Sequence, residues 1–206
     1  MSRVRIGIDF DNTIICYDKV FDAAARQRGL VPDGWTGSKT EVRDYLRAKP
    51  DGELAWQGLQ GWAYGKGIGG AEMFPGVRDF LAACHRNRAA VCIVSHKTRY
   101  GHQDPDSTDL REAARSWLKS TGLIDAETSI LRSDDVYFED TQAAKVERLA
   151  GLDLDVFIDD LVDVFEQPSF PRHTRPILFG VATDARPGRY KSFASWAGIM
   201  REVFAG

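Results

Sequence analysis

The stretch Val4 to Thr13 constrains the fold of this chain more than any other. Its sequence, VRIGIDFDNT, is a short run of β-branched and apolar residues, too brief for a helix, that ends in Asp9 and Asp11. On a strand, residues i and i+2 share a face, so the two carboxylates point the same way unless the chain turns between them. The carboxyl edge of an open α/β sheet is where such folds bind ligands.

Two neighbouring carboxylates need electrostatic compensation. At roughly 4 Å they repel by about 4 kcal/mol at the effective dielectric of such sites, so they require a cation, a shared proton or divergent directions. A hard dication such as Mg²⁺ suits oxygen ligands of this kind. The alternative is that Asp9 and Asp11 are turn and helix-cap residues, because Asp, Asn and Thr are all common at those positions.

The pattern apolar-apolar-Asp-x-Asp-x-Thr resembles the first motif of the haloacid dehalogenase superfamily, and the later motifs follow in the expected order. Those motifs are carried by four residues: Ser95, Lys145, Asp159 and Asp160. The serine and the aspartate pair each end a strand-like run, and the lysine lies on a predicted helix. The resemblance covers the whole chain; its first and last motifs are specific, whereas a lone serine or lysine is not.

The resemblance implies an α/β fold, a three-layer Rossmann-like parallel sheet with a small helical cap insertion. The residues agree, because strands and helices alternate after residue 75. Strands are predicted over 91–95, 136–138, 155–158 and 176–179, and helices over 109–120, 141–150 and 193–204.

The segment 14–74 shows helical periodicity and no strand-like alternation, which is typical of an insertion. Its position between the first two motifs resembles that of the superfamily's helical cap. We therefore predict a core domain of residues 1–13 and 75–206 and a helical cap of residues 14–74. Four glycines between positions 65 and 70 provide a flexible return to the core.

By resemblance, Asp9 is the nucleophile that forms an aspartyl-phosphate, and Asp11 is the general acid and base. The resemblance also implies Mg²⁺, bound by Asp9, by Asp11 through its backbone carbonyl, and by one or both of Asp159 and Asp160. Asp160 is favoured as the direct ligand, because the second position of such pairs matches the superfamily's metal-binding aspartate.

The substrate phosphate is expected to contact Ser95, His96 and Lys145. A serine at a strand end can donate to a phosphoryl oxygen, and a lysine can neutralise the charge of the phosphate and the carboxylates. His96 flanks the expected site. Lys97 is a rival to Lys145 for the same role, and the ordinary alternatives are a turn serine and a solvated helix lysine.

Composition narrows the class of protein. The chain has 206 residues and a net charge of -3, which gives no electrostatic footprint for nucleic acid. No apolar run is long enough to span a bilayer, and a strand begins too early to leave room for a signal peptide. We therefore expect a cytoplasmic protein with no membrane partner, whose three cysteines are reduced.

The sequence thus predicts a Mg²⁺-dependent phosphatase that hydrolyses a small phosphomonoester, such as a sugar phosphate or a nucleotide. A 5'-nucleotidase-like hydrolase of the same superfamily is the alternative within the enzyme class. A dehalogenase is less favoured, because those members lack an acid at the place of Asp11. A non-catalytic phosphate- or metal-binding module on the same fold is the alternative outside it.

Overall fold

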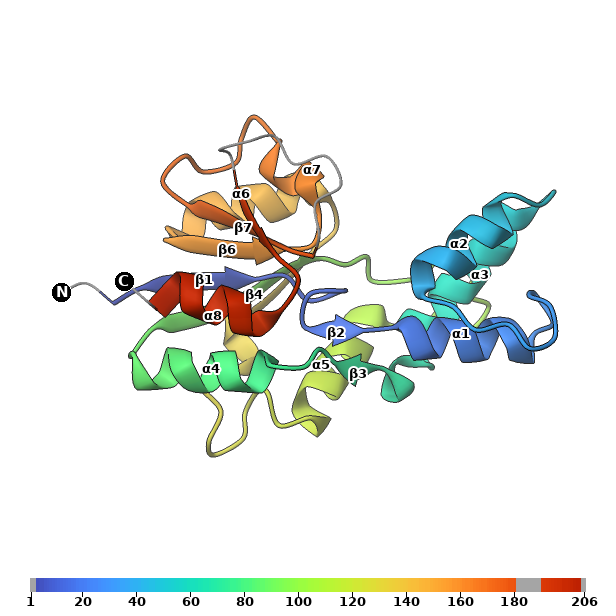
Figure 1. Cartoon of the computed structure of the whole chain (residues 1–206), viewed down its shortest axis with the longest axis horizontal. Coiled ribbons are helices and arrows are strands. Elements are labelled where there is room, and N and C mark those ends of the chain that lie inside the picture. The colour runs from blue at the N-terminus through green and yellow to red at the C-terminus, as the bar shows by residue number, and fades with distance from the viewer. Residues whose placement is uncertain (1–2, 181–189, 205–206) are drawn as a thin grey trace. The chain divides into compact units, whose positions relative to one another are not determined.

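A computed structural model of the chain describes residues 3–180 and 190–204 (Figure 1). The chain divides into two compact units. The core unit comprises Met1–Ile15, Met73–Lys97 and Gly122–Gly206, and the helical unit comprises Cys16–Glu72 and Thr98–Thr121.

A six-stranded sheet forms the centre of the core unit, and its order is β5-β4-β1-β6-β7-β8. All five pairings are parallel. The strands are β1 Arg5–Ile8, β4 Ala90–His96, β5 Val136–Glu139, β6 Val156–Asp159, β7 Arg175–Phe179 and β8 Lys191–Phe193. Because every strand runs the same way, the residues that follow the strands meet at one edge.

Helices cover both faces of this sheet (Figure 1). They are α4 Val77–Arg86, α6 Gln142–Leu152, α7 Val162–Phe165 and α8 Trp196–Phe204, with a short 3₁₀ turn, η2, at Ser133–Asp135. On one face, Val146 and Leu149 of α6 pack in a buried cluster with Phe157 of β6 and Leu178 of β7. The near-continuous apolar strands are what a sheet buried on both faces requires.

On the other face, α4 and α8 pack against each other through aromatic side chains. The rings of Phe80 and Trp196 have centroids 4.9 Å apart, and Trp196 also lies 5.6 Å from Phe179 at the end of β7. Trp196 is fully buried, and its indole N–H donates to the Thr13 carbonyl at 3.1 Å. These contacts complete the predicted three-layer architecture.

The helical unit has its own aromatic core. Its elements are α1 Asp18–Gln27, α2 Lys39–Arg47, α3 Gly52–Tyr64, the 3₁₀ turn η1 Ile68–Gly70 and α5 Leu110–Ser120. Phe21 and Trp56 are buried and stacked with ring centroids 4.9 Å apart. The helix α2 begins at a capping box, in which Ser38 and Glu41 exchange hydrogen bonds.

The segment 98–121 belongs to the helical unit, whereas the sequence-based boundaries assigned it to the core domain. The physical reason is close packing of this segment on α3 and η1. The indole N–H of Trp117 donates to the Ala71 carbonyl at 3.2 Å. A Cβ atom on Gly101 would lie only 2.7 Å from the Cα of Gly61, so these two backbones touch directly.

Three short strands were not predicted. The strands β2 Ile15–Cys16 and β3 Glu72–Met73 form a two-stranded sheet, and the division between the units falls within each of them. The strand β8 occupies the start of the predicted closing helix, which begins at Trp196 instead of residue 193. Segments of two or three residues carry too little periodicity to be recognised.

Within the described residues, no helix combines the length and apolar character needed to cross a membrane. The three cysteines are free, as expected; Cys84 is buried and Cys16 and Cys92 are partly buried.

Candidate active site

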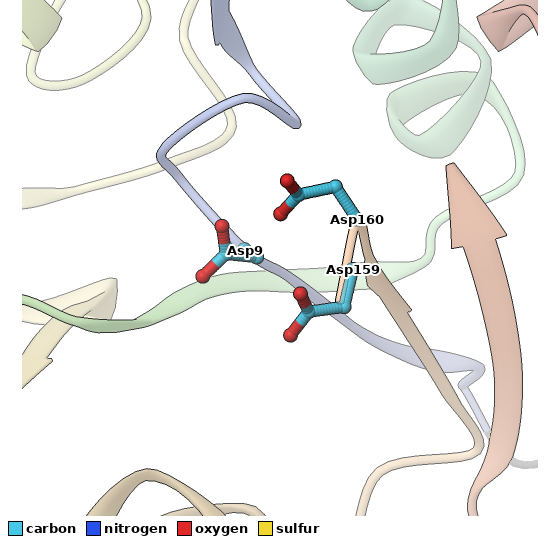
Figure 2. Close-up of side chains that lie close together, drawn as sticks. All are labelled: Asp9, Asp159 and Asp160. Carbon is cyan, nitrogen blue, oxygen red and sulfur yellow. The ribbon is translucent and has the colours of Figure 1, made fainter. Parts of the chain in front are cut away.

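Three carboxylates meet at the ends of the two central strands. Asp9 follows β1, Asp159 is the last residue of β6, and Asp160 comes next. The pairing of Ile8 with Ile158 places them at the same level of the sheet, and the Asp9 N–H donates to the Ile158 carbonyl at 2.8 Å. One oxygen of each carboxylate lies within 4.8 Å of the others, and Figure 2 shows the three groups converging.

The ammonium group of Lys145 lies between two of these carboxylates. Its Nζ is 2.6 Å from Asp9 Oδ1 and 2.6 Å from Asp159 Oδ2, and its side chain is almost wholly buried. Helix α6 brings it there. The Thr141 hydroxyl caps the helix by accepting from the Ala144 N–H, and Val146 beside Lys145 packs in the core.

One lysine cannot neutralise two buried carboxylates. Burial raises the pKa of Asp9 to about 7; Lys145 opposes this shift, and Asp159 and Asp11 add to it. Burial by itself would lower the pKa of Lys145, but the charges of Asp159 and Asp9 outweigh that effect and raise it. The cluster therefore holds a firmly charged lysine and excess negative charge, and it favours a further cation.

Asp11 lies apart from this cluster and contacts a different lysine. Lys97 Nζ is 2.8 Å from Asp11 Oδ2 and 3.1 Å from Oδ1. The backbone turns sharply at this point, since Asn12 has a φ of 60° and the Ile14 N–H donates back to the Phe10 carbonyl at 3.0 Å. Separate lysine partners thus relieve the repulsion that the sequence implied for Asp9 and Asp11.

Comparison with solved structures establishes the architecture. A haloacid dehalogenase-like hydrolase from Streptococcus pneumoniae aligns over 98% of both chains with a TM-score of 0.62 and 14% identity. The chain therefore has the haloacid dehalogenase fold. This result confirms the fold class and the resemblance that the sequence indicated.

Other solved structures are comparably similar to this chain. A family hydrolase from Deinococcus radiodurans, solved with bound phosphate and sodium, aligns over 98% of this chain and 95% of that one, with a TM-score of 0.55 and 15% identity. Protein Tyrosine Kinase A of Mycobacterium tuberculosis aligns over 98% of both chains, with a TM-score of 0.63 and 17% identity. No family model and no curated protein sequence matches the chain.

On this haloacid dehalogenase fold, Ser95 and Lys97 share one side of the β4 terminus. Ser95 and Lys97 are buried and His96 between them is exposed, which is the alternation of an extended chain. Ser95 lies beside Phe138 in the register of β5, and His96 beside Glu139. Desolvation lowers the pKa of His96, which favours the neutral imidazole. Contacts of these residues with a substrate phosphate stay predictions.

The donor set fits a hard dication. Asp9, Asp159 and Asp160 offer carboxylate oxygens only, which are the ligands that Mg²⁺ prefers. Both oxygens of Asp159 already accept hydrogen bonds, from Lys145 and from the Leu161 N–H at 3.0 Å. Asp160 Oδ1 likewise lies 3.5 Å from the Thr13 hydroxyl, so the choice of Asp160 as the direct ligand stays a prediction. The Asp11 side chain lies on Lys97 and is not part of the three-carboxylate group.

Thr13 is a site residue whose role the sequence did not suggest. It is fully buried, and its hydroxyl lies 3.5 Å from Asp160 Oδ1. The motif that ends in Asp-x-Asp-x-Thr contains it, so the signal was present, but a threonine in that position reads equally well as a turn residue.

Proposed function

We propose that the protein is a Mg²⁺-dependent phosphatase that hydrolyses a small phosphomonoester through an aspartyl-phosphate on Asp9. The observation that carries the proposal is the division of the carboxylates into two sets. Asp9 lies with Lys145 in a buried, cation-demanding cluster, and Asp11 is held separately by Lys97. A nucleophile and a proton carrier require such different surroundings.

The reaction then proceeds in two steps. A carboxylate oxygen of Asp9 attacks phosphorus, the bond from phosphorus to the ester oxygen breaks, and Asp11, which enters this step protonated, gives its proton to the departing alcohol oxygen. In the second step Asp11 takes a proton from water, whose oxygen attacks the phosphorus of the aspartyl-phosphate. The bond to Asp9 breaks, inorganic phosphate leaves, and Asp9 returns to its carboxylate form.

Charge neutralisation by the chain's own residues supports this chemistry. Lys145 compensates the nucleophile and the incoming phosphate, and the hydroxyl of the buried Ser95 is proposed to donate to a phosphoryl oxygen. Asp9 and Asp160 would hold Mg²⁺, with Asp159 fixing Lys145 in place. When bound, Mg²⁺ supplies positive charge to the transferring phosphoryl group.

The helical unit is proposed to act as a cap that selects small substrates. In the sequence, its main segment, Cys16–Glu72, begins after the turn that follows Asp11 and ends before α4. This is the position at which the insertion was predicted. A cap would exclude water from the aspartyl-phosphate and limit access to small molecules. Sugar phosphates and nucleotides are the two substrate classes to compare, and cytoplasmic location remains a prediction.

Hydrolysis of p-nitrophenyl phosphate with Mg²⁺ or with EDTA tests the proposal. We expect turnover with Mg²⁺ and its loss in EDTA. The same fold occurs in a protein named as a tyrosine kinase, so the assay should also include ATP with a tyrosine-containing peptide. Peptide phosphorylation, or phosphate binding without turnover of any ester, would contradict the proposed phosphatase.

A further inference from the structure

The ammonium group of the buried Lys97 contacts both carboxylate oxygens of Asp11. Its Nζ lies 2.8 Å from Oδ2 and 3.1 Å from Oδ1. The Lys97 side chain is 2% exposed and that of Asp11 19% exposed. Ionised groups at this depth are stable only when paired, so the contact is a strong constraint on where both side chains lie.

The sheet fixes the position of this lysine. The Lys97 N–H donates to the Glu139 carbonyl at 2.9 Å, which continues the pairing of β4 with β5 by one residue. Its ammonium group lies 5.6 Å from the centroid of the fully buried Phe10 ring, and the centroids of the Phe10 and Phe138 rings lie 5.9 Å apart in an edge-to-face arrangement. The lysine is therefore a rigid support and not a solvated chain.

The two buried lysines of the site serve different carboxylates. Lys145 contacts Asp9 and Asp159, and Lys97 contacts Asp11. We propose that Lys97 is the positioning residue of the acid-base group: it holds the Asp11 carboxylate away from the three-carboxylate cluster and oriented for proton transfer. It acts through Asp11 and does not bind the substrate phosphate. This inference rests on the proposed phosphatase function.

The orientation of Asp11 determines how well it can transfer a proton. A proton carrier contributes about 10²- to 10⁴-fold only when it lies within hydrogen-bond reach of the reacting oxygen. Without Lys97, the Asp11 carboxylate loses this close ion pair, and its charge is repelled by that of Asp9 two positions earlier. Loss of Lys97 should then cost part of what loss of Asp11 costs.

A double-mutant cycle with two esters tests the proposal. Lys97→Met removes the charge and leaves an unbranched side chain one atom shorter; it should lower kcat for an alkyl phosphate by roughly 10- to 100-fold, a part of what acid-base catalysis contributes. The loss for p-nitrophenyl phosphate should be much smaller, because that leaving group needs little protonation. KM should change little, and Lys97→Met should have no further effect in an Asp11→Asn background. Lys97→Arg should restore part of the rate.

Lys191→Met is the matched control. Lys191 also pairs with a carboxylate of the core unit, Glu202 at 2.9 Å, but it is exposed, so its loss should leave the rate ratio of the two esters unchanged. The proposal is overturned if Lys97→Met raises KM for both esters and its effect persists in the Asp11→Asn background, because Lys97 would then bind phosphate. Equal kcat losses for both esters would assign it a purely structural role.

A measurement that does not need turnover separates this inference from the proposed function. The free energies of unfolding of Lys97→Met, Asp11→Asn and the double variant form a second cycle. Non-additive values are expected, whereas additive values would overturn the idea that Lys97 holds Asp11. If the wild-type chain hydrolyses no ester, the proposed function fails. This unfolding cycle still tests whether Lys97 holds Asp11.

Discussion

At the scale of single residues, the site manages an excess of negative charge. The site contains four carboxylates but only two buried ammonium groups, those of Lys145 and Lys97. Two negative charges are left when all the carboxylates are ionised, which is the charge that one dication compensates. The electrostatics therefore favour a site that is completed by a divalent cation.

Replacement of Asp9 separates chemistry from stability. Asp9→Asn should reduce turnover of p-nitrophenyl phosphate by at least about 10⁴-fold, the usual cost of removing a nucleophile. The metal-free variant should unfold at the same temperature as the wild type or higher, because burial disfavours the charged form of Asp9. Assays and thermal unfolding of the same preparation check both. Asp134→Asn, at an exposed position of the core unit, is the control. Retained activity of the Asp9→Asn variant would show that Asp9 is not the nucleophile.

Lys145 should matter for folding as well as for catalysis. Lys145→Met leaves Asp9 and Asp159 buried without their shared cation and should lower the free energy of unfolding by about 3 to 5 kcal/mol near neutral pH. Mg²⁺ should restore part of this loss. Urea unfolding with and without Mg²⁺ measures it. Lys191→Met, which breaks an exposed pair, should cost less than about 1 kcal/mol; equal costs would contradict the account.

Much of the candidate site could be predicted from the sequence, because the aspartates follow recognisable strands. The assignment of the lysines could not. Lys97 and Asp11 are 86 positions apart, and only the parallel pairing of β1 with β4 brings their ends together. Lys145 and Asp9 are 136 positions apart. Side-chain partners across a sheet depend on register, which a single sequence does not contain.

At the scale of elements, the helical unit depends on a direct backbone contact. Gly101→Ala would put a Cβ atom 2.7 Å from the Cα of Gly61, which no side-chain movement can relieve. The substitution should destabilise the protein by about 1 to 3 kcal/mol, the usual cost of overpacking. Gly69→Ala is the control, since nothing lies within 4 Å of its added Cβ. The midpoints of chemical unfolding of the two variants should differ clearly. Similar midpoints would argue against this contact.

The same contact shows where element prediction from sequence reaches its limit. The long helices were predicted because their periodicity and caps are local, as with Thr141 before α6 and Asp109 before α5. The grouping of residues 98–121 with α3 was not predicted, because it depends on two glycines 40 positions apart that leave no hydrophobic pattern. Local chemistry sets the elements, and contacts distant in sequence set their grouping.

At the scale of the whole molecule, proton binding at Asp9 links folding to pH. In the metal-free protein burial raises the pKa of Asp9 from 3.8 to about 7. Between these values the folded state binds more protons than the unfolded state, so this group makes the free energy of unfolding fall as pH rises. Its stabilising effect is complete below 3.8 and is lost as pH passes through about 7.

Mg²⁺ should reverse this trend, because a metal ligand must be deprotonated and the proton competes with the cation for Asp9. The increase in Tm on adding Mg²⁺ should therefore be small near about pH 5.5 and larger near about pH 8, on either side of the raised pKa of Asp9. Thermal unfolding at the two pH values with Mg²⁺ or EDTA measures the difference. In Asp9→Asn the increase should be smaller and should depend less on pH. An equal increase at both pH values in the wild type would show that Asp9 does not bind the cation.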